Sequence, residues 1–299
     1  MASLYTHKES NIRKTFFLFF IFLVVVIGIG WAFSYVYNSS LILWIAVIFS
    51  SVMAIISYWY SDKIVLRMAN AVPIDMKNNP ELYRIVENLS ITAGLPMPRL
   101  YLVREQAPNA FATGRNPQNS VVAVTEGLLN KLDRSELEGV IAHELSHIGN
   151  RDMLVGTVAV ILVGFISLIA DMFMRSLFWG GMRSRDRGNG HAVIIFIGIV
   201  LSILAPIAAM LMQLAISRKR ELLADASGSL LTRYPEGLAS ALIKISTDFT
   251  PMRAANNTTA HLWLDDPFKG KRKTSFLHKL FMTHPPVEDR VRALRGIQV

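Results

Sequence analysis

The chain has 299 residues, of which 52% are hydrophobic, and it carries a formal net charge of +9. Its mean hydropathy of +0.37 indicates an integral membrane protein. The absence of cysteine excludes disulfides and thiolate metal ligands. No zinc finger, phosphate loop or aromatic–basic motif accompanies the positive charge, so nucleic acid is not an expected partner. Much of this charge flanks apolar segments, as at Arg218–Arg220, which favours a lipid bilayer as the partner.

Two apolar segments open the chain, near residues 15–37 and 41–60. Each is long enough to cross a bilayer, so residues 1–60 are predicted to form a transmembrane hairpin. The first segment does not resemble a cleavable signal, because its apolar run is longer than a signal core and no small-residue cleavage pattern follows it.

Basic residues lie on one side of this hairpin. Arg13 and Lys14 precede the first segment, Lys63 and Arg67 follow the second, and the connecting loop 38–40 has no charge. The positive-inside rule therefore places the amino terminus and the residues after the hairpin in the cytoplasm.

Residues 61–152 contain the start of an α+β domain. Asn79-Pro80 begins an amphipathic helix that is expected to end near Gly94. Residues 99–104 and 121–124 have the composition of short strands, which predicts a small sheet beside the helix that follows.

That next helix carries His143-Glu144-Leu145-Ser146-His147. Asp133 and Glu136 form the sequence pattern of a capping box at its start. Residues four apart share a helix face, so the two imidazoles can bind one Zn²⁺, and Glu144 can take a proton from the attacking water. The alternative is an ordinary amphipathic helix with two surface histidines.

A catalytic zinc needs a third protein ligand. A third histidine close to the motif is excluded, because the positions that it requires hold Asn150 and Met153. The next glutamate along the chain is Glu221, and Asp225 lies four residues further on a predicted helix. Glu221 is therefore the candidate ligand and Asp225 a candidate for bracing a ligand, unless the two form a solvated charged face.

Two further apolar segments, near residues 153–174 and 192–216, separate these motifs and predict a second transmembrane hairpin. An even number of crossings is required to bring both half-sites to one side of the membrane. If the helix continues from His147 into the third segment, the site lies roughly 9 Å from the membrane. The loop Arg175–His191 carries four arginines against one aspartate, which also allows a hairpin that is only partly inserted. Residues 217–299 complete the catalytic domain, giving an α+β membrane protein with four spans and a mainly helical, zincin-like domain.

The order of apolar segments and the two motifs, including Ser217-Arg218-Lys219-Arg220-Glu221-Leu222-Leu223-Ala224-Asp225, resembles the HtpX membrane metalloproteases. These belong with the CAAX prenyl proteases in one gluzincin family. The resemblance implies one Zn²⁺ per chain, held by His143, His147 and Glu221. It also implies Glu144 as general base and acid, and Asp225 as the residue that orients a zinc-binding histidine.

The resemblance extends to three further places. The segment Asn109-Ala110-Phe111-Ala112 is similar to an edge strand that binds substrate in the family, although a plain hairpin strand fits the sequence too. His284 is similar to a histidine that stabilises the oxyanion, or else it is a histidine at a loop–helix junction. Asp152 matches a recurring family residue, and a structural salt bridge or an anchor at the membrane interface explains it equally well.

The activity implied is that of a membrane-embedded zinc endopeptidase that degrades misfolded or damaged membrane proteins. It implies a multi-pass protein of the bacterial cytoplasmic membrane with its active site facing the cytoplasm. The alternatives are a CAAX-type prenyl protease, a non-catalytic membrane adaptor that holds zinc, and an anchored hydrolase of other substrates. The sequence leaves open whether the chain forms a homo-oligomer.

Overall fold

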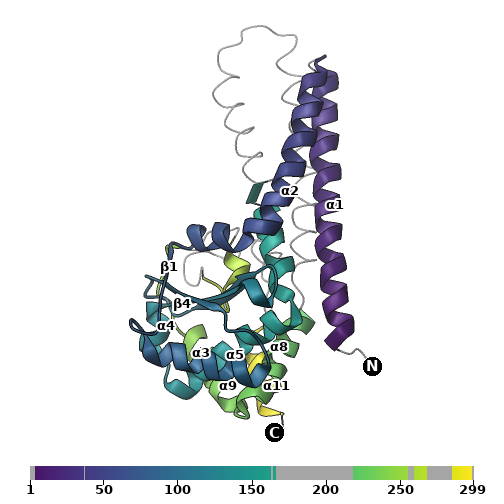
Figure 1. Ribbon diagram of the computed structural model, residues 1–299. Coiled ribbons are helices and arrows are strands. Elements are labelled where there is room, and N and C mark those ends of the chain that lie inside the picture. Colours follow the sequence, from purple (N-terminus) through teal and green to yellow (C-terminus); the bar gives the residue numbers. More distant parts are fainter. Residues whose placement is uncertain are drawn as a thin grey trace.

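The computed structural model describes residues 4–36, 38–162, 164–165, 218–254, 259–267 and 285–297. A long helical hairpin stands on a globular part in which helices surround a small sheet (Figure 1). The mixed helical and β character predicted from the sequence is therefore confirmed. The predicted span 192–216, residues 163 and 166–174 of the predicted span 153–174, and His284 lie outside the described residues.

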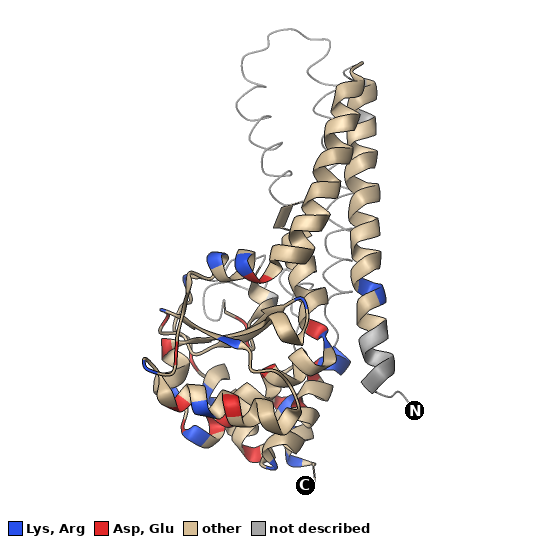
Figure 2. Ribbon diagram, in the orientation of Figure 1, with Lys and Arg blue, Asp and Glu red and all other residues tan. Residues whose placement is uncertain are grey.

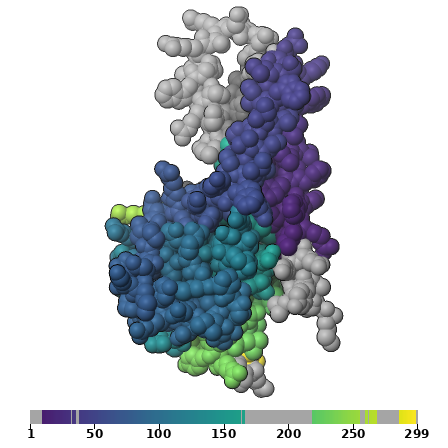
Figure 3. Space-filling view, in the orientation of Figure 1, coloured from purple at the N-terminus to yellow at the C-terminus, as the bar shows by residue number. Residues whose placement is uncertain are grey.

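The hairpin consists of α1 (Leu4–Val36) and α2 (Ser40–Met68). Within them, Ser10–Tyr35 and Ser40–Met68 are long and apolar enough to cross a membrane. Basic residues lie only near the base of the hairpin, and the length above is free of charge (Figure 2). Figure 3 shows the same two helices projecting beyond the globular part. Their large apolar side chains are more than half exposed at Phe16, Phe20, Trp31, Trp44, Ile48, Ile55 and Trp59.

α2 continues past residue 60, where the predicted membrane span ends. Its last two turns enter the globular part, where Asp62, Val65 and Leu66 are buried. The boundary that we predicted between residues 60 and 61 therefore falls inside one continuous helix. β1 (Ala71–Pro73) follows directly. This strand is not predictable from the sequence, because three residues are too few to show an alternating pattern.

The sheet has the order β1-β2-β4-β3. β2 (Arg99–Val103) and β4 (Ser120–Thr125) confirm the two predicted strands and pair in parallel. β3 (Ala110–Gly114) pairs antiparallel with β4 and forms one edge, as predicted for the segment that begins at Asn109. The short helix η1 (Pro117–Asn119) connects β3 to β4.

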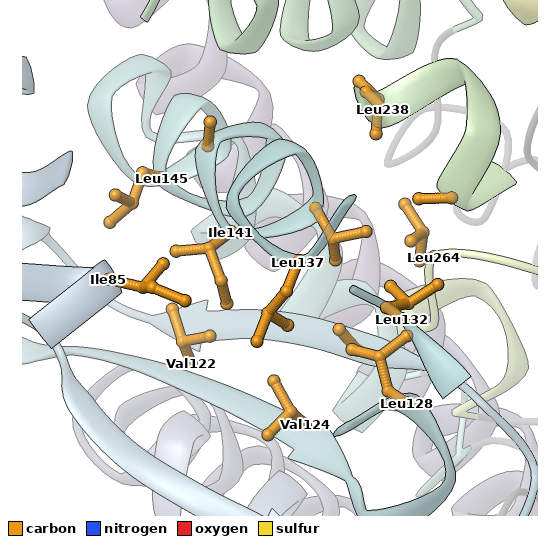
Figure 4. Packing of buried hydrophobic residues seen from close by; sticks show 14 of the residues in the cluster. Ile85, Val122, Val124, Leu128, Leu132, Leu137, Ile141, Leu145, Leu238 and Leu264 are labelled. Atoms are coloured by element: carbon orange, nitrogen blue, oxygen red, sulfur yellow. The ribbon is translucent and has the colours of Figure 1, made fainter. Parts of the chain in front are cut away.

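Several helices pack on one face of the sheet through a shared apolar core. α3 (Pro80–Ala93) begins at the Asn79 cap and ends at Gly94 in the left-handed conformation, as predicted. Around it lie α4 (Glu126–Lys131), α5 (Arg134–Asn150), α8 (Arg218–Thr232), α9 (Pro235–Ser246) and α11 (Val287–Arg295). Leu137 and Ile141 of α5 face Val122 and Val124 of β4 (Figure 4). α5 is thus the central helix of the globular part, and this position fixes the direction of its polar face.

Candidate metal centre

α5 begins at the capping box that the sequence predicts. Asp133 Oδ1 accepts from the backbone N–H of Glu136 at 3.0 Å, and Glu136 Oε2 accepts from the backbone N–H of Asp133 at 2.9 Å. The apolar residues along one face of α5 are all buried: Leu137, Val140, Ile141, Leu145 and Ile148. With one face fixed in the core, His143 and His147 project together from another.

The third predicted ligand joins them from α8. The Nε2 atoms of His143 and His147 are 3.1 Å apart. Glu221 Oε2 lies 3.8 Å from His143 Nε2, and Glu221 Oε1 lies 3.5 Å from His147 Nε2. One ligand atom from each of the three residues lies within 4.8 Å of the others. The structure therefore brings together the three side chains proposed from the sequence, although 73 residues separate His147 from Glu221.

Asp225 lies behind His143, one helical turn after Glu221. Its Oδ1 is 2.9 Å from His143 Nδ1, so the opposite ring nitrogen, Nε2, faces Glu221 and His147. Arg290 of α11 donates to both Asp225 oxygens, from Nε at 2.8 Å and from Nη2 at 2.7 Å. Burial raises the pKa of the Asp225 carboxyl, but the charge and hydrogen bonds of Arg290 outweigh burial and lower it to about 2. Asp225 is therefore an anion that keeps His143 in one orientation.

Gly228 of α8 allows the backbone of this helix to pack directly against the backbone of α5. A Cβ added to Gly228 would lie 2.9 Å from the backbone N of His143 and 3.1 Å from the carbonyl carbon of Ala142. Backbone atoms cannot move aside as a flexible side chain can, so any larger residue would push the two helices apart. Because Glu221 and Asp225 are on α8, this separation would also open the metal centre.

His147 is surrounded by negative charge. Its Nδ1 lies 3.3 Å from Asp152 Oδ2, on the side of the ring opposite to Glu221. Burial by itself lowers the pKa of His147, but Glu221, Asp152 and Glu144 outweigh burial and raise the pKa to about 9. The same negative charge favours a metal cation between the imidazoles.

The helix of the motif does not run on into the third apolar segment. Arg151 ends α5 in the left-handed conformation, with φ of 56°, and a separate helix begins at Asp152. The continuous helix assumed in the sequence analysis, on which the distance of 9 Å to the membrane rested, is therefore absent. The chain turns at Arg151, and this turn brings the side chain of Asp152 into contact with His147.

Glu144 lies on α5 between the two candidate histidine ligands in sequence and is 3% exposed. It directly follows His143 in the helix, and its charge contributes to the raised pKa of His147. A carboxylate in this position can receive a proton from a water molecule that reacts between the ligands.

The predicted substrate segment lies beside α5, but its side chains point into the protein. Asn109 Nδ2 donates to the carbonyl of Asp265 at 2.9 Å, and the Phe111 ring packs edge-on against Trp263. Ala110 and Ala112 are buried as well. Only main-chain atoms of this segment are therefore left to pair with another chain.

The geometry defines a class of protein. Two imidazoles four residues apart and a carboxylate from a second helix form the donor set of a metal-dependent hydrolase, and the buried glutamate next to the first imidazole can serve as its base. Residues 76–298 match peptidase family M48. The chain belongs to this family and is a metalloprotease.

Relatives match over nearly the full length. The chain is 43% identical to the protease HtpX homolog of Caldanaerobacter subterraneus subsp. tengcongensis, and the alignment covers 99% of both chains. It is 46% identical to the protease HtpX homolog of Thermococcus kodakarensis, over 93% of this chain and 94% of the relative. The predicted resemblance is thus confirmed.

A solved structure shares the fold. The crystal structure of S. mikatae Ste24p superposes with a TM-score of 0.50 at 18% identity and covers 93% of this chain. The chain spans 62% of the length of that structure.

Proposed function

We propose that the chain is a zinc endopeptidase of the membrane, with one Zn²⁺ held by His143, His147 and Glu221. The observation that carries this proposal is the convergence of the three ligand atoms within 4.8 Å. The orientation of the two imidazoles also fits such an ion. Asp225 and Asp152 contact the Nδ1 atoms of the two histidines, which leaves both Nε2 atoms for the metal. Nitrogen and carboxylate donors in this combination favour zinc.

Glu144 performs the proton transfers. When bound, zinc supplies a Lewis acid that polarises the scissile carbonyl and lowers the pKa of water. As the water oxygen bonds to the carbonyl carbon, Glu144 accepts one of its protons. The C–N bond then breaks, and Glu144 delivers that proton to the leaving nitrogen, which departs as an amine. Arg290 and Asp225 hold His143 in place throughout. His284, which lies outside the described residues, is proposed to stabilise the oxyanion.

The outer edge of β3 is proposed to bind the substrate as an additional strand. Thr125 N donates to Asn109 O, so Asn109 belongs to a hydrogen-bonded pair with β4. In an antiparallel ladder every second residue forms such a pair, so the residues that bond to β4 are 109, 111 and 113. Ala110 and Ala112 therefore direct their main-chain groups away from β4. The carbonyl of Ala110 already accepts from Leu264 N at 2.9 Å. Ala112 is then the position for an extended substrate, and pairing through the main chain demands little sequence, as degradation of misfolded chains requires.

The proposed topology has four spans. Residues 1–60 and 153–216 form the two hairpins, and residues 61–152 and 217–299 form the catalytic domain. Arg13 and Lys14 in the first half of α1, and Lys63 and Arg67 in the last turns of α2, support a cytoplasmic orientation by the positive-inside rule. We propose the bacterial cytoplasmic membrane as the location, and unfolded or damaged membrane proteins as the substrates, with self-association of the chain left to measurement.

The test is hydrolysis of an unfolded model protein by the full chain purified in detergent. We expect cleavage at internal peptide bonds, loss of cleavage after treatment with a chelator, and recovery on addition of about one equivalent of zinc. Cleavage restricted to the tail of a prenylated peptide would support the CAAX-type alternative instead. A zinc-loaded protein that cleaves neither substrate would support the adaptor and contradict the proposed activity.

A further inference from the structure

We propose that Asn11 of α1 is a positioning residue of the metal centre, which it reaches through Asp152 and His147. This inference rests on the proposed zinc site and adds a role for the first helix. α1 would then do more than attach the catalytic domain to the membrane, because its base would determine how firmly one zinc ligand is held.

The contact between Asp152 and His147 depends on the turn at the end of α5. In an uninterrupted helix, residues five apart point in directions about 140° apart, so Asp152 would face away from His147. The left-handed conformation of Arg151, with φ of 56°, ends the helix and reverses this direction. Asp152 Oδ2 consequently lies 3.3 Å from His147 Nδ1. Its other oxygen, Oδ1, points away from the imidazole.

Asn11 binds that second oxygen. Its Nδ2 donates to Asp152 Oδ1 at 2.6 Å and to the backbone carbonyl of Asn150 at 3.1 Å. A carboxylate and a carbonyl can only accept, so the amide nitrogen of Asn11, with its two protons, must face them. Asn11 is 3% exposed and Asp152 is 7% exposed, so the hydrogen bonds are shielded from water. One amide from α1 therefore fixes both the aspartate and the end of the helix that carries His147.

A second donor competes with the Asn11 amide for Asp152. Arg220 of α8 is near the same oxygen, with Nη1 at 3.5 Å from Oδ1. The carboxylate thus lies where α1, α5 and α8 meet, and the amide at 2.6 Å is the closer of these two donors. Without Asn11, Asp152 can turn toward Arg220 and away from His147. His147 would then lose the contact that holds its ring for metal binding.

The test measures zinc loss from the full chain in detergent, using a chromogenic chelator. Asn11→Leu removes the amide but keeps a similar volume, and Asp152→Asn removes the carboxylate. Thr15→Val is the matched control, because Thr15 is buried one turn further along α1 and its hydroxyl bonds only the carbonyl of Asn11 among the described residues. We expect Asp152→Asn and Asn11→Leu each to speed zinc loss by roughly 10- to 100-fold, and Thr15→Val to leave it near the wild-type rate.

The double variant shows whether Asn11 acts through Asp152. Adding Asn11→Leu to Asp152→Asn should then speed zinc loss no further than Asp152→Asn alone. The absorption spectrum of the cobalt-substituted protein should change in Asn11→Leu and stay constant in Thr15→Val. The inference is overturned if Asn11→Leu releases zinc at the wild-type rate, or if the two effects multiply. A wild-type chain that holds no zinc would overturn the proposed function as well.

Discussion

Replacing Glu144 by glutamine is expected to slow peptide hydrolysis by roughly 10²- to 10⁴-fold while zinc stays bound. Glutamine has nearly the same shape as glutamate, so the packing around this buried position is retained. It cannot accept a proton from water or pass one to the leaving nitrogen. Since Glu144 is not among the three proposed ligands, zinc content should remain at the wild-type level, measured on the same sample as the rate.

Glu138→Gln is the matched control for this experiment. Glu138 lies on the same helix, pairs with Arg134 at 3.0 Å and is far more exposed than Glu144. Its replacement should leave both zinc content and rate unchanged. A Glu144→Gln protein that holds zinc and hydrolyses at the rate of the wild type would exclude Glu144 as the base.

Arg290→Met is expected to destabilise the chain by about 3–5 kcal/mol, because it leaves the buried Asp225 carboxylate without its cation. Arg290 is 1% exposed and bonds both oxygens of Asp225, so water cannot replace it. For a domain of this size, the midpoint of thermal unfolding should fall by roughly 6–20 °C.

The ion pair also predicts how stability depends on pH. Because the pKa of Asp225 is held at about 2, below its ordinary value, the pair contributes its full stability above about pH 4 and loses it only as the pH falls toward 2.

Two companion variants make this result specific. Arg292→Met, two residues further along α11, removes an arginine whose side chain is 81% exposed, and the midpoint should shift by less than about 2 °C. Adding Asp225→Asn to Arg290→Met removes the uncompensated charge and should recover part of the stability. If Arg290→Met unfolds at the temperature of the wild type, the ion pair does not support His143 as described.

Local patterns explain what the sequence predicted correctly. The capping box at Asp133, the Asn79 cap with Gly94, and the positions of His143 and His147 on one face follow from residues at most fifteen apart. Each depends on backbone hydrogen bonds within one helix, so spacing alone is sufficient. Glu221 was found by a different route, since zinc needs a third ligand and few carboxylates were available.

Contacts between segments far apart in the sequence could not be predicted from local spacing. Arg290 is one of many arginines, and no local pattern indicates that it pairs with Asp225. Asn11 stands near the start of an apolar helix, where an asparagine usually indicates no more than the edge of a span. The turn at Arg151 was missed because left-handed conformation is uncommon outside glycine, and arginine gives no signal for it. The continuation of α2 beyond the predicted span 41–60 could not be predicted from hydropathy either, since a helix leaving a membrane need not end there.

The zinc content and zinc affinity of the wild type, compared with those of Glu221→Gln, test the central claim most directly. The structure places Glu221 between the two imidazoles, so the wild type should hold about one zinc per chain. Glu221→Gln keeps the shape of the side chain but lacks the charge, and it should lose zinc to a chelator that the wild type resists. A wild type without zinc, or a Glu221→Gln variant that binds zinc as tightly as the wild type does, would contradict the assignment of this metal centre.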